Sequence, residues 1–190
     1  MLDAAIARRL KLVALDVDGV LTDNGLYLGV VGDHPVELKR FHIQDGLGIR
    51  MLQSVGLLVA WVSGRESSAT VARARELSVD ELIQDPTARK VPALEALLTR
   101  RNLTWQQCAF VGDDLADLPV LARVGLSVAV ANAVAEVKEA AQFVTRTPGG
   151  SGAVREVAEL ILKARGEWRE FLTTYFVERG DVPHGAGRSR

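Results

Sequence analysis

An apolar run near the amino terminus restricts the fold of this chain more than any other feature of its sequence. The run starts at Leu12 and ends at Asp16, Asp18 and Gly19. A run of this length that contains β-branched residues suits a strand buried on both faces, as in the middle of a parallel sheet. Its carboxylates would then lie at the carboxyl end of the strand, where open α/β sheets bind ligands. An ordinary turn is the alternative, because Asp and Gly both favour turns.

The composition predicts a single soluble globular domain. Hydrophobic residues make up 48% of the 190 residues and charged residues 25%, and the net charge of −1 leaves no basic excess for binding nucleic acid. No apolar leader and no membrane-spanning apolar run is present, which predicts no membrane partner and a cytoplasmic location. Cys108 has no internal disulfide partner and lies in an apolar segment, so we expect it to be buried and inert.

Strand-like apolar segments alternate with amphipathic helical segments along the chain. Strands are predicted at residues 12–20, 57–62, 82–83, 108–111, 126–130 and 143–145. Helices are predicted at residues 46–54, 66–77, 92–101, 115–124, 137–141, 152–164 and 167–176. This alternation is typical of right-handed βαβ units. It predicts an α/β fold of three layers, a Rossmann-like parallel sheet flanked by helices.

A β-hairpin interrupts this pattern. Two short alternating segments, residues 25–28 and 36–41, are separated by a Gly- and Pro-containing stretch and predict a hairpin that projects from the sheet. We expect one domain over residues 1–176, with the hairpin at about residues 25–41. Residues 177–190 are rich in Gly and Arg and predict a flexible carboxyl-terminal tail.

Polar residues follow three of the predicted strands. They are Asp16 and Asp18 after the first strand, Ser63 and Gly64 after the second, and Asp113 and Asp114 after the third. Because parallel strands end at the same edge of a sheet, these residues can converge, and Lys90 ahead of a helix can join them. Clustered carboxylates repel one another unless a hard cation such as Mg²⁺ lies between them. Hydroxyl, lysine and glycine-flanked amide groups suit a phosphate, so the set predicts phosphoryl transfer.

The two aspartates after the first strand suggest two different catalytic roles. A carboxylate attacks phosphorus without needing a base, and Asp16 lies at the strand end where such an attack is possible. Asp18, two residues on, could protonate the leaving alcohol and then take a proton from the hydrolytic water. Mg²⁺ and Lys90 would offset the charge on the transferring group.

The chain resembles the haloacid dehalogenase-like phosphatases in four motifs, which are Asp16-Val17-Asp18-Gly19-Val20, Val62-Ser63-Gly64-Arg65, Lys90, and Gly112-Asp113-Asp114 with Asp117. The resemblance implies that Asp16 is the nucleophile and Asp18 the general acid and base. It implies phosphate binding by Ser63, Gly64 and Lys90. It also implies a Mg²⁺ site of Asp16, Asp18 and Asp113, with Asp114 and Asp117 in support.

Longer segments are similar to one branch of that family, the 3-deoxy-D-manno-octulosonate 8-phosphate phosphatases. The similar segments are residues 16–23, 41–50, 112–119 and 149–156, and the resemblance extends over about residues 11–163. It implies an enzyme without a large cap domain, whose hairpin assembles a homotetramer in which one subunit closes a neighbour's site. The implied substrate is an anionic 2-keto sugar acid phosphate.

The substrate carboxylate requires a cation, and Arg65 and Arg73, on the segment after the second strand, are the candidates. Arg65 resembles the octulosonate enzymes, since nonulosonate phosphatases often carry Glu there. Ser151 replaces an Arg that the branch usually has, and Asn24 replaces a common Gly. The loss of charge at Ser151 leaves a nonulosonate 9-phosphate, or another small metabolite, as the alternative substrate. A non-catalytic tetrameric module of the same fold is the alternative from another class.

Three histidines are scattered along the chain, at His34, His42 and His184. No pair of them has the spacing of metal ligands, which argues against a zinc site. His42 precedes Asp45 and could line the site, or could be a solvent-facing residue of the hairpin.

Overall fold

The computed structural model describes residues 2–180, and its centre is a six-stranded parallel sheet with the strand order β5-β4-β1-β6-β7-β8. The strands are β1 (Leu12–Leu15), β4 (Leu58–Ser63), β5 (Glu81–Gln84), β6 (Cys108–Gly112), β7 (Leu126–Ala129) and β8 (Phe143–Val144). The first part of the apolar run near the amino terminus forms β1, which pairs in parallel with β4 on one side and β6 on the other. All four residues of β1 are buried.

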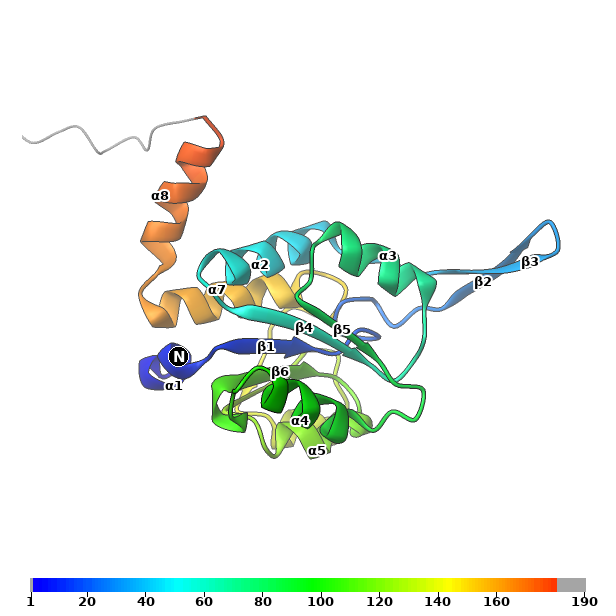
Figure 1. Cartoon of the computed structure of the whole chain (residues 1–190), viewed down its shortest axis with the longest axis horizontal. Coiled ribbons are helices and arrows are strands. Elements are labelled where there is room, and N and C mark those ends of the chain that lie inside the picture. The colour runs from blue at the N-terminus through cyan, green and yellow to red at the C-terminus, as the bar shows by residue number, and fades with distance from the viewer. Residues whose placement is uncertain (1, 181–190) are drawn as a thin grey trace, which may run out of the picture.

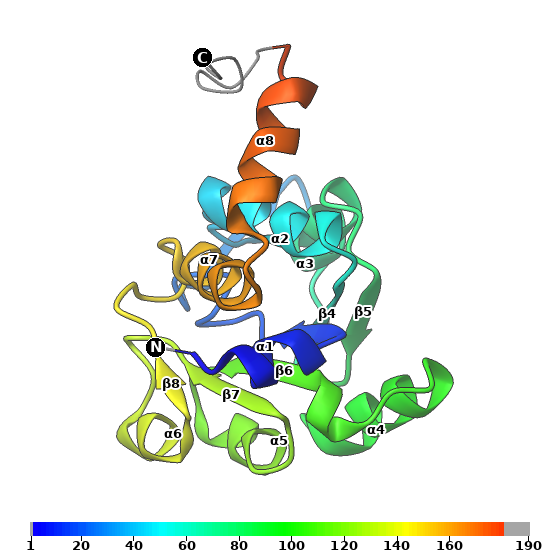
Figure 2. The same ribbon diagram turned by 90° about the vertical axis from the view of Figure 1, so that its left-hand side faces the viewer.

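Helices cover both faces of the sheet, which confirms the three-layer α/β prediction (Figures 1 and 2). One layer consists of α2 (Ile43–Ser54), α3 (Ser68–Glu76) and α7 (Ala153–Arg165). The opposite layer consists of α4 (Lys90–Arg100), α5 (Leu118–Leu121) and α6 (Ala135–Ala140). Buried residues from both layers and from the sheet form one hydrophobic core.

Several local predictions differ from the structure. The strand predicted at residues 12–20 already ends at Leu15. The helix α1 (Ala4–Arg9) was not predicted, although Asp3 caps it by accepting hydrogen bonds from the amides of Ala5 and Ile6. The helix predicted at residues 115–124 is divided into a 3₁₀ turn at Leu115–Asp117 and the short α5. Pro119 lies in the first turn of α5 and has no amide hydrogen, so an unbroken helix cannot run through this position. A second 3₁₀ turn spans Trp105–Gln107.

The hairpin is present and projects from the body of the molecule (Figure 1). Its strands β2 (Tyr27–Val31) and β3 (His34–Leu38) pair in antiparallel register, with Val31 opposite His34. The turn contains only Gly32 and Asp33, so the strands extend further toward the tip than the sequence predicted. Every residue of β2 is exposed.

The last helix, α8 (Trp168–Glu178), follows α7 after Gly166 and rises away from the sheet (Figures 1 and 2). It ends two residues beyond the predicted boundary at residue 176. The rest of the predicted tail, from residue 181, and His184 with it, lie outside the described residues. No helix within residues 2–180 is long and apolar enough to cross a membrane.

Candidate functional site

A cavity of about 240 Å³ lies at the carboxyl ends of β1 and β6, beside the start of α4. Eight of the residues predicted for the site line it: Asp16, Asp18, Gly64, Arg65, Lys90, Asp113, Asp114 and Asp117. The shared edge of the parallel sheet brings these residues together over a separation of about a hundred positions in the chain. Asn24, one of the two departures from the branch pattern, also lines the cavity.

Lys90 connects two carboxylates at the floor of this cavity. Its Nζ lies 2.7 Å from Oδ1 of Asp16 and 2.6 Å from Oδ1 of Asp117, and all three side chains are at most 9% exposed. Oδ2 of Asp117 accepts hydrogen bonds from the amides of Asp113 (2.9 Å) and Asp114 (3.3 Å). Asp117 therefore fixes both Lys90 and the turn after β6.

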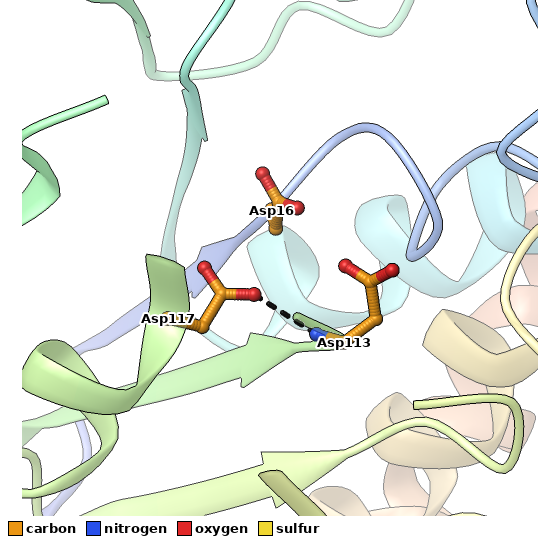
Figure 3. A group of neighbouring side chains, drawn as sticks. All are labelled: Asp16, Asp113 and Asp117. Atoms are coloured by element: carbon orange, nitrogen blue, oxygen red, sulfur yellow. Dashed lines mark hydrogen bonds between the residues drawn. The ribbon is translucent and has the colours of Figure 1, made fainter. Parts of the chain in front are cut away.

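Asp16, Asp113 and Asp117 each offer a carboxylate oxygen within 4.8 Å of the others (Figure 3). Oδ1 of Asp113 is buried and has no hydrogen-bond partner among the described residues. Asp113 also packs against Gly19, where a Cβ would lie 2.0 Å from its Oδ2 and the φ angle is +92°. Only glycine fits this position, because a side chain would both clash with Asp113 and strain the backbone.

The pKa values of this cluster respond to its burial. Burial raises the pKa of Asp16 to about 6, against the opposing attraction of Lys90. Burial and the nearby charges of Asp16 and Asp117 raise the pKa of Asp113 to about 8. Burial alone would lower the pKa of Lys90, but the attraction of Asp16 and Asp117 outweighs it, so the pKa is raised and the ammonium stays charged.

Asp18 lines the same cavity but forms an ion pair of its own. Its Oδ1 lies 2.6 Å from Nζ of Lys39, which follows β3 at the base of the hairpin. The side chain of Lys39 is completely buried. The close cluster of acidic oxygens contains Asp117 and not Asp18. The metal site of Asp16, Asp18 and Asp113 stays a prediction.

The turn after β4 carries the predicted phosphate-binding residues. Oγ of Ser63 accepts a hydrogen bond from the amide of Arg65 and donates one to its carbonyl oxygen, both at 3.1 Å. Ser63 is 1% exposed and is not among the residues that line the cavity. Gly64 does line it, and a Cβ there would lie 3.0 Å from Cβ of Ala88.

The two arginines predicted to bind the substrate lie in different places. Arg65 lines the cavity, and its guanidinium lies 3.1 Å from Glu37. Arg73 pairs with Glu76 at 2.8 Å and lies against Gly46 of α2, outside the cavity. The structure therefore does not bring Arg73 to the carboxylate cluster.

Ser151 lies on an exposed part of the loop before α7. This loop packs against the segment after β1, since the amide of Gly150 donates to the carbonyl of Val20 at 2.9 Å. Asn132 joins the same two segments, because its side chain accepts from the amide of Gly149 (2.7 Å) and donates to the carbonyl of Gly19 (3.5 Å). His42 is outside the cavity, and its Nδ1 is buried.

Lys39 is the site residue that sequence reasoning missed. It lies in the segment predicted as the second hairpin strand, where alternation alone does not say which side chains turn back toward the sheet. Charged and apolar residues alternate at Glu37, Leu38 and Lys39. This alternation indicated that the two charged side chains lie on the same face of the strand.

Comparison with known proteins identifies the family. A model of the haloacid dehalogenase-like hydrolases matches residues 66–157. The chain is 42% identical over 166 residues to the 3-deoxy-D-manno-octulosonate 8-phosphate phosphatase KdsC of Escherichia coli K12, covering 87% of this chain and 86% of that protein.

Solved structures agree with this. The phosphatase of the same name from Moraxella catarrhalis, in complex with a magnesium ion, a phosphate ion and a KDO molecule, superposes with a TM-score of 0.84 at 36% identity, covering 90% of this chain and 97% of that one. The cobalt-bound enzyme from Haemophilus influenzae gives a TM-score of 0.78 at 40% identity, covering 85% and 92%. The chain therefore belongs to the haloacid dehalogenase-like hydrolases, in the family of the 3-deoxy-D-manno-octulosonate 8-phosphate phosphatases.

Proposed function

We propose that this protein is a Mg²⁺-dependent phosphatase that hydrolyses 3-deoxy-D-manno-octulosonate 8-phosphate to the free sugar acid and phosphate. The observation that carries the proposal is the buried contact of Lys90 with Asp16 and Asp117 beside Asp113. It presents a nucleophilic carboxylate and a cation on the same cavity. The substrate is inferred from relatives that carry this activity in their names.

The residues present fit a magnesium ion. Oδ1 of Asp113 has no hydrogen-bond partner within residues 2–180, and buried carboxylate oxygens without partners are costly unless a cation binds them. Oxygen ligands of this type are those that Mg²⁺ prefers. We propose that Asp16 and Asp113 hold the ion through their carboxylates, with Asp18 as the third residue of the set through its backbone carbonyl oxygen, because its side chain is paired with Lys39. When bound, Mg²⁺ would neutralise charge on the phosphoryl oxygens.

In the first step, a carboxylate oxygen of Asp16 attacks phosphorus, and the bond between phosphorus and the sugar oxygen breaks. Asp18 gives its proton to that oxygen, so the sugar acid leaves as an alcohol. Lys90 already contacts Asp16 and can offset the charge of the transferring group. The product of this step is an aspartyl phosphate on Asp16.

In the second step, water attacks the phosphorus of the aspartyl phosphate. Asp18, now a carboxylate, takes a proton from this water, and the bond between phosphorus and the Asp16 oxygen breaks. Phosphate leaves, and the carboxylate of Asp16 and the protonated Asp18 are restored. Ser63 and Gly64 would support the phosphate through the turn after β4, and Asp114 and Asp117 would hold the opposite turn.

We propose Arg65 as the residue that binds the substrate carboxylate. It lines the cavity, and its side chain is 45% exposed, so it can turn from Glu37 to a ligand. An arginine fork matches a carboxylate in geometry and charge. Ser151 keeps a nonulosonate 9-phosphate as the second candidate, because the loop beside Gly19 lacks the usual positive charge.

We propose that the hairpin takes part in the assembly of a homotetramer. Leu28, Val30 and Val31 are each at least 67% exposed, which is unusual for apolar residues gathered on one element. A second copy of the chain is the partner that the resemblance implies. We also propose a cytoplasmic location, where the enzyme would meet a multiply charged sugar phosphate that cannot leave through an apolar bilayer.

The test measures phosphate release with Mg²⁺ from the octulosonate 8-phosphate, a nonulosonate 9-phosphate and 4-nitrophenyl phosphate. We expect the octulosonate to be preferred, and Asp16→Asn to lower kcat by at least about 10³-fold, because the nucleophile is lost. Asp3→Asn is the matched control and should keep wild-type activity, because Asp3 is exposed at the N-cap of α1 and Asn serves equally well as a cap.

Equal rates on all three substrates would contradict the proposed substrate while keeping the mechanism. An Asp16→Asn enzyme that stays active would contradict the mechanism. Absence of release by the wild-type protein would favour the non-catalytic module.

A further inference from the structure

We infer that Lys39 is a positioning residue that fixes the carboxylate of Asp18 for proton transfer to the leaving group. This inference rests on the proposed phosphatase function. It adds a role for the base of the hairpin in the chemistry of the same chain.

Lys39 is bound to Asp18 through a short contact in which the lysine side chain is buried. Its Nζ lies 2.6 Å from Oδ1 of Asp18, and its side chain is 0% exposed. The same Nζ lies 3.4 Å from Oγ1 of Thr70 on α3 and 3.8 Å from Oε1 of Glu37 on β3. The ammonium group thus has partners from three segments of the chain.

The burial of Lys39 is unusual for its location. Its neighbour Leu38 is 64% exposed, as is typical of the hairpin strands. Withdrawing an ammonium group from water is costly unless a carboxylate and hydrogen bonds compensate for it. The pair with Asp18 provides that compensation and fixes the position of both groups.

Glu37 attaches the same strand to the turn after β4. Its carboxylate accepts a hydrogen bond from the guanidinium of Arg65 at 3.1 Å and another from the hydroxyl of Ser67. Ser67 is also the N-cap of α3 and accepts from the amide of Thr70 at 3.2 Å. The base of the hairpin is therefore bound to the loop that forms one wall of the cavity.

This arrangement leaves one oxygen of Asp18 for the reaction. Lys39 holds Oδ1, whereas Oδ2 takes part in no hydrogen bond within the described part of the chain. Asp18 lines the cavity, so a carboxylate anchored at Oδ1 can exchange a proton there through its other oxygen. Without the anchor, the side chain can rotate and spend less time in the productive geometry.

If Lys39 acts through Asp18, the effect of its loss should depend on the leaving group of the substrate. A purely structural role would not have this dependence. A poor leaving group must be protonated as it departs, whereas 4-nitrophenolate leaves as a stable anion. Loss of Lys39 should therefore reduce kcat/KM more for poor leaving groups, because kcat/KM covers the steps up to leaving-group departure. A merely structural defect would reduce kcat/KM by the same factor for all substrates.

The experiment compares the octulosonate 8-phosphate, phenyl phosphate and 4-nitrophenyl phosphate, each with Mg²⁺, in wild type, Lys39→Met and Lys39→Arg. The matched control is Lys11→Met, the same change at an exposed lysine at the opposite end of β1. For Lys39→Met we expect a loss of about tenfold or more on the octulosonate, an intermediate loss on phenyl phosphate and less than about threefold on 4-nitrophenyl phosphate. Lys39→Arg should recover part of the octulosonate rate.

The ratio between substrates within one preparation does not depend on the folded fraction, so partial misfolding cannot produce this result. Equal losses on all three substrates, or no loss, would overturn the inference while leaving the proposed function intact. Wild-type protein that hydrolyses none of the three would overturn the proposed function and this inference with it.

Discussion

Asp113 is the least satisfied carboxylate of the buried cluster. One of its oxygens has no hydrogen-bond partner among residues 2–180, and the cluster contains a single lysine for three acids. Burial and the charges of Asp16 and Asp117 raise its pKa from 3.8 to about 8. A group whose pKa is raised by folding binds protons better in the folded than in the unfolded protein. Its contribution to stability is therefore greatest at low pH and falls as the pH rises.

This leads to a prediction for metal-free protein. In EDTA, the contribution of Asp113 to the free energy of unfolding should decrease as the pH rises from about 4 to about 8, because the unfolded chain gives up this proton first. Thermal unfolding across this range measures it. Asp113→Asn is the control variant, and its stability should fall less steeply with pH than that of the wild type.

The same pKa predicts proton release on metal binding, because a cation displaces the proton from the carboxyl group. Calorimetric titration with Mg²⁺ at pH 7, in buffers of different ionisation enthalpy, should detect protons released by the wild type and fewer by Asp113→Asn. Binding without proton release would argue against a protonated Asp113 in the metal-free protein.

The residues of the site were predictable where the sheet alone places them. Asp16, Lys90 and Asp113 follow strands or begin a helix at one edge, so their convergence follows from parallel pairing. Arg73 was not brought to that edge, because its helix directs it toward Gly46 of α2. Side-chain direction on a helix after a loop of unknown geometry cannot be read from spacing.

At the scale of the elements, the hairpin is unusual because it exposes several large apolar side chains to solvent. Within residues 2–180 its two strands pair only with each other, and β2 carries five exposed residues. An isolated hairpin with apolar side chains is marginally stable in water, so a partner surface would stabilise it. The exposed backbone edges of both strands are also open to pairing.

We expect Val30→Glu to weaken self-association. Val30 is 70% exposed on β2, and a carboxylate at an apolar interface must lose water without gaining a partner. Analytical ultracentrifugation should find smaller assemblies for the variant at equal protein concentration.

The control for this experiment is Val177→Glu on α8, where Val177 is 61% exposed outside the hairpin. It should leave the assembly unchanged. A monomeric wild-type protein, or equal effects of both substitutions, would contradict association through the hairpin.

The regular elements were predictable because their apolar residues follow the period of a strand or a helix. The short helices were harder to predict. Their boundaries depend on single residues, the break at Pro119 and the cap by Asp3. The spacing of apolar residues does not reveal such boundaries. The hairpin strands lie nearer the tip than predicted, because Gly29 and Pro35, which suggested a loop, are paired within the ladder.

In the molecule as a whole, β1 and β6 form the centre of the sheet and of the core. Phe110 on β6 is completely buried, pairs in register with neighbouring Ala14, and has Nζ of Lys90 at 5.9 Å from its ring centroid. The same strand therefore contributes to the core and carries Asp113 at its end.

Phe110→Ala should lower the free energy of unfolding by about 3–5 kcal/mol, because it removes a large buried side chain and leaves a cavity. Phe176→Ala is the matched control, since Phe176 is 43% exposed, and should cost less than about 1 kcal/mol. Denaturant unfolding at fixed protein concentration compares the two. Similar costs would contradict the central place of Phe110 in the core.

The position of β1 between β4 and β6 has a consequence during synthesis of the chain. Its first neighbour, β4, is made early, but its second begins only at Cys108, so a nascent chain of about a hundred residues carries an open apolar edge. The carboxylate cluster of Asp16, Asp113 and Asp117 is also incomplete until β6 and the turn after it have been made. A ribosome that stops before β6 would release an inactive fragment prone to aggregation, and the phosphatase would arise only once both halves of the sheet had been translated.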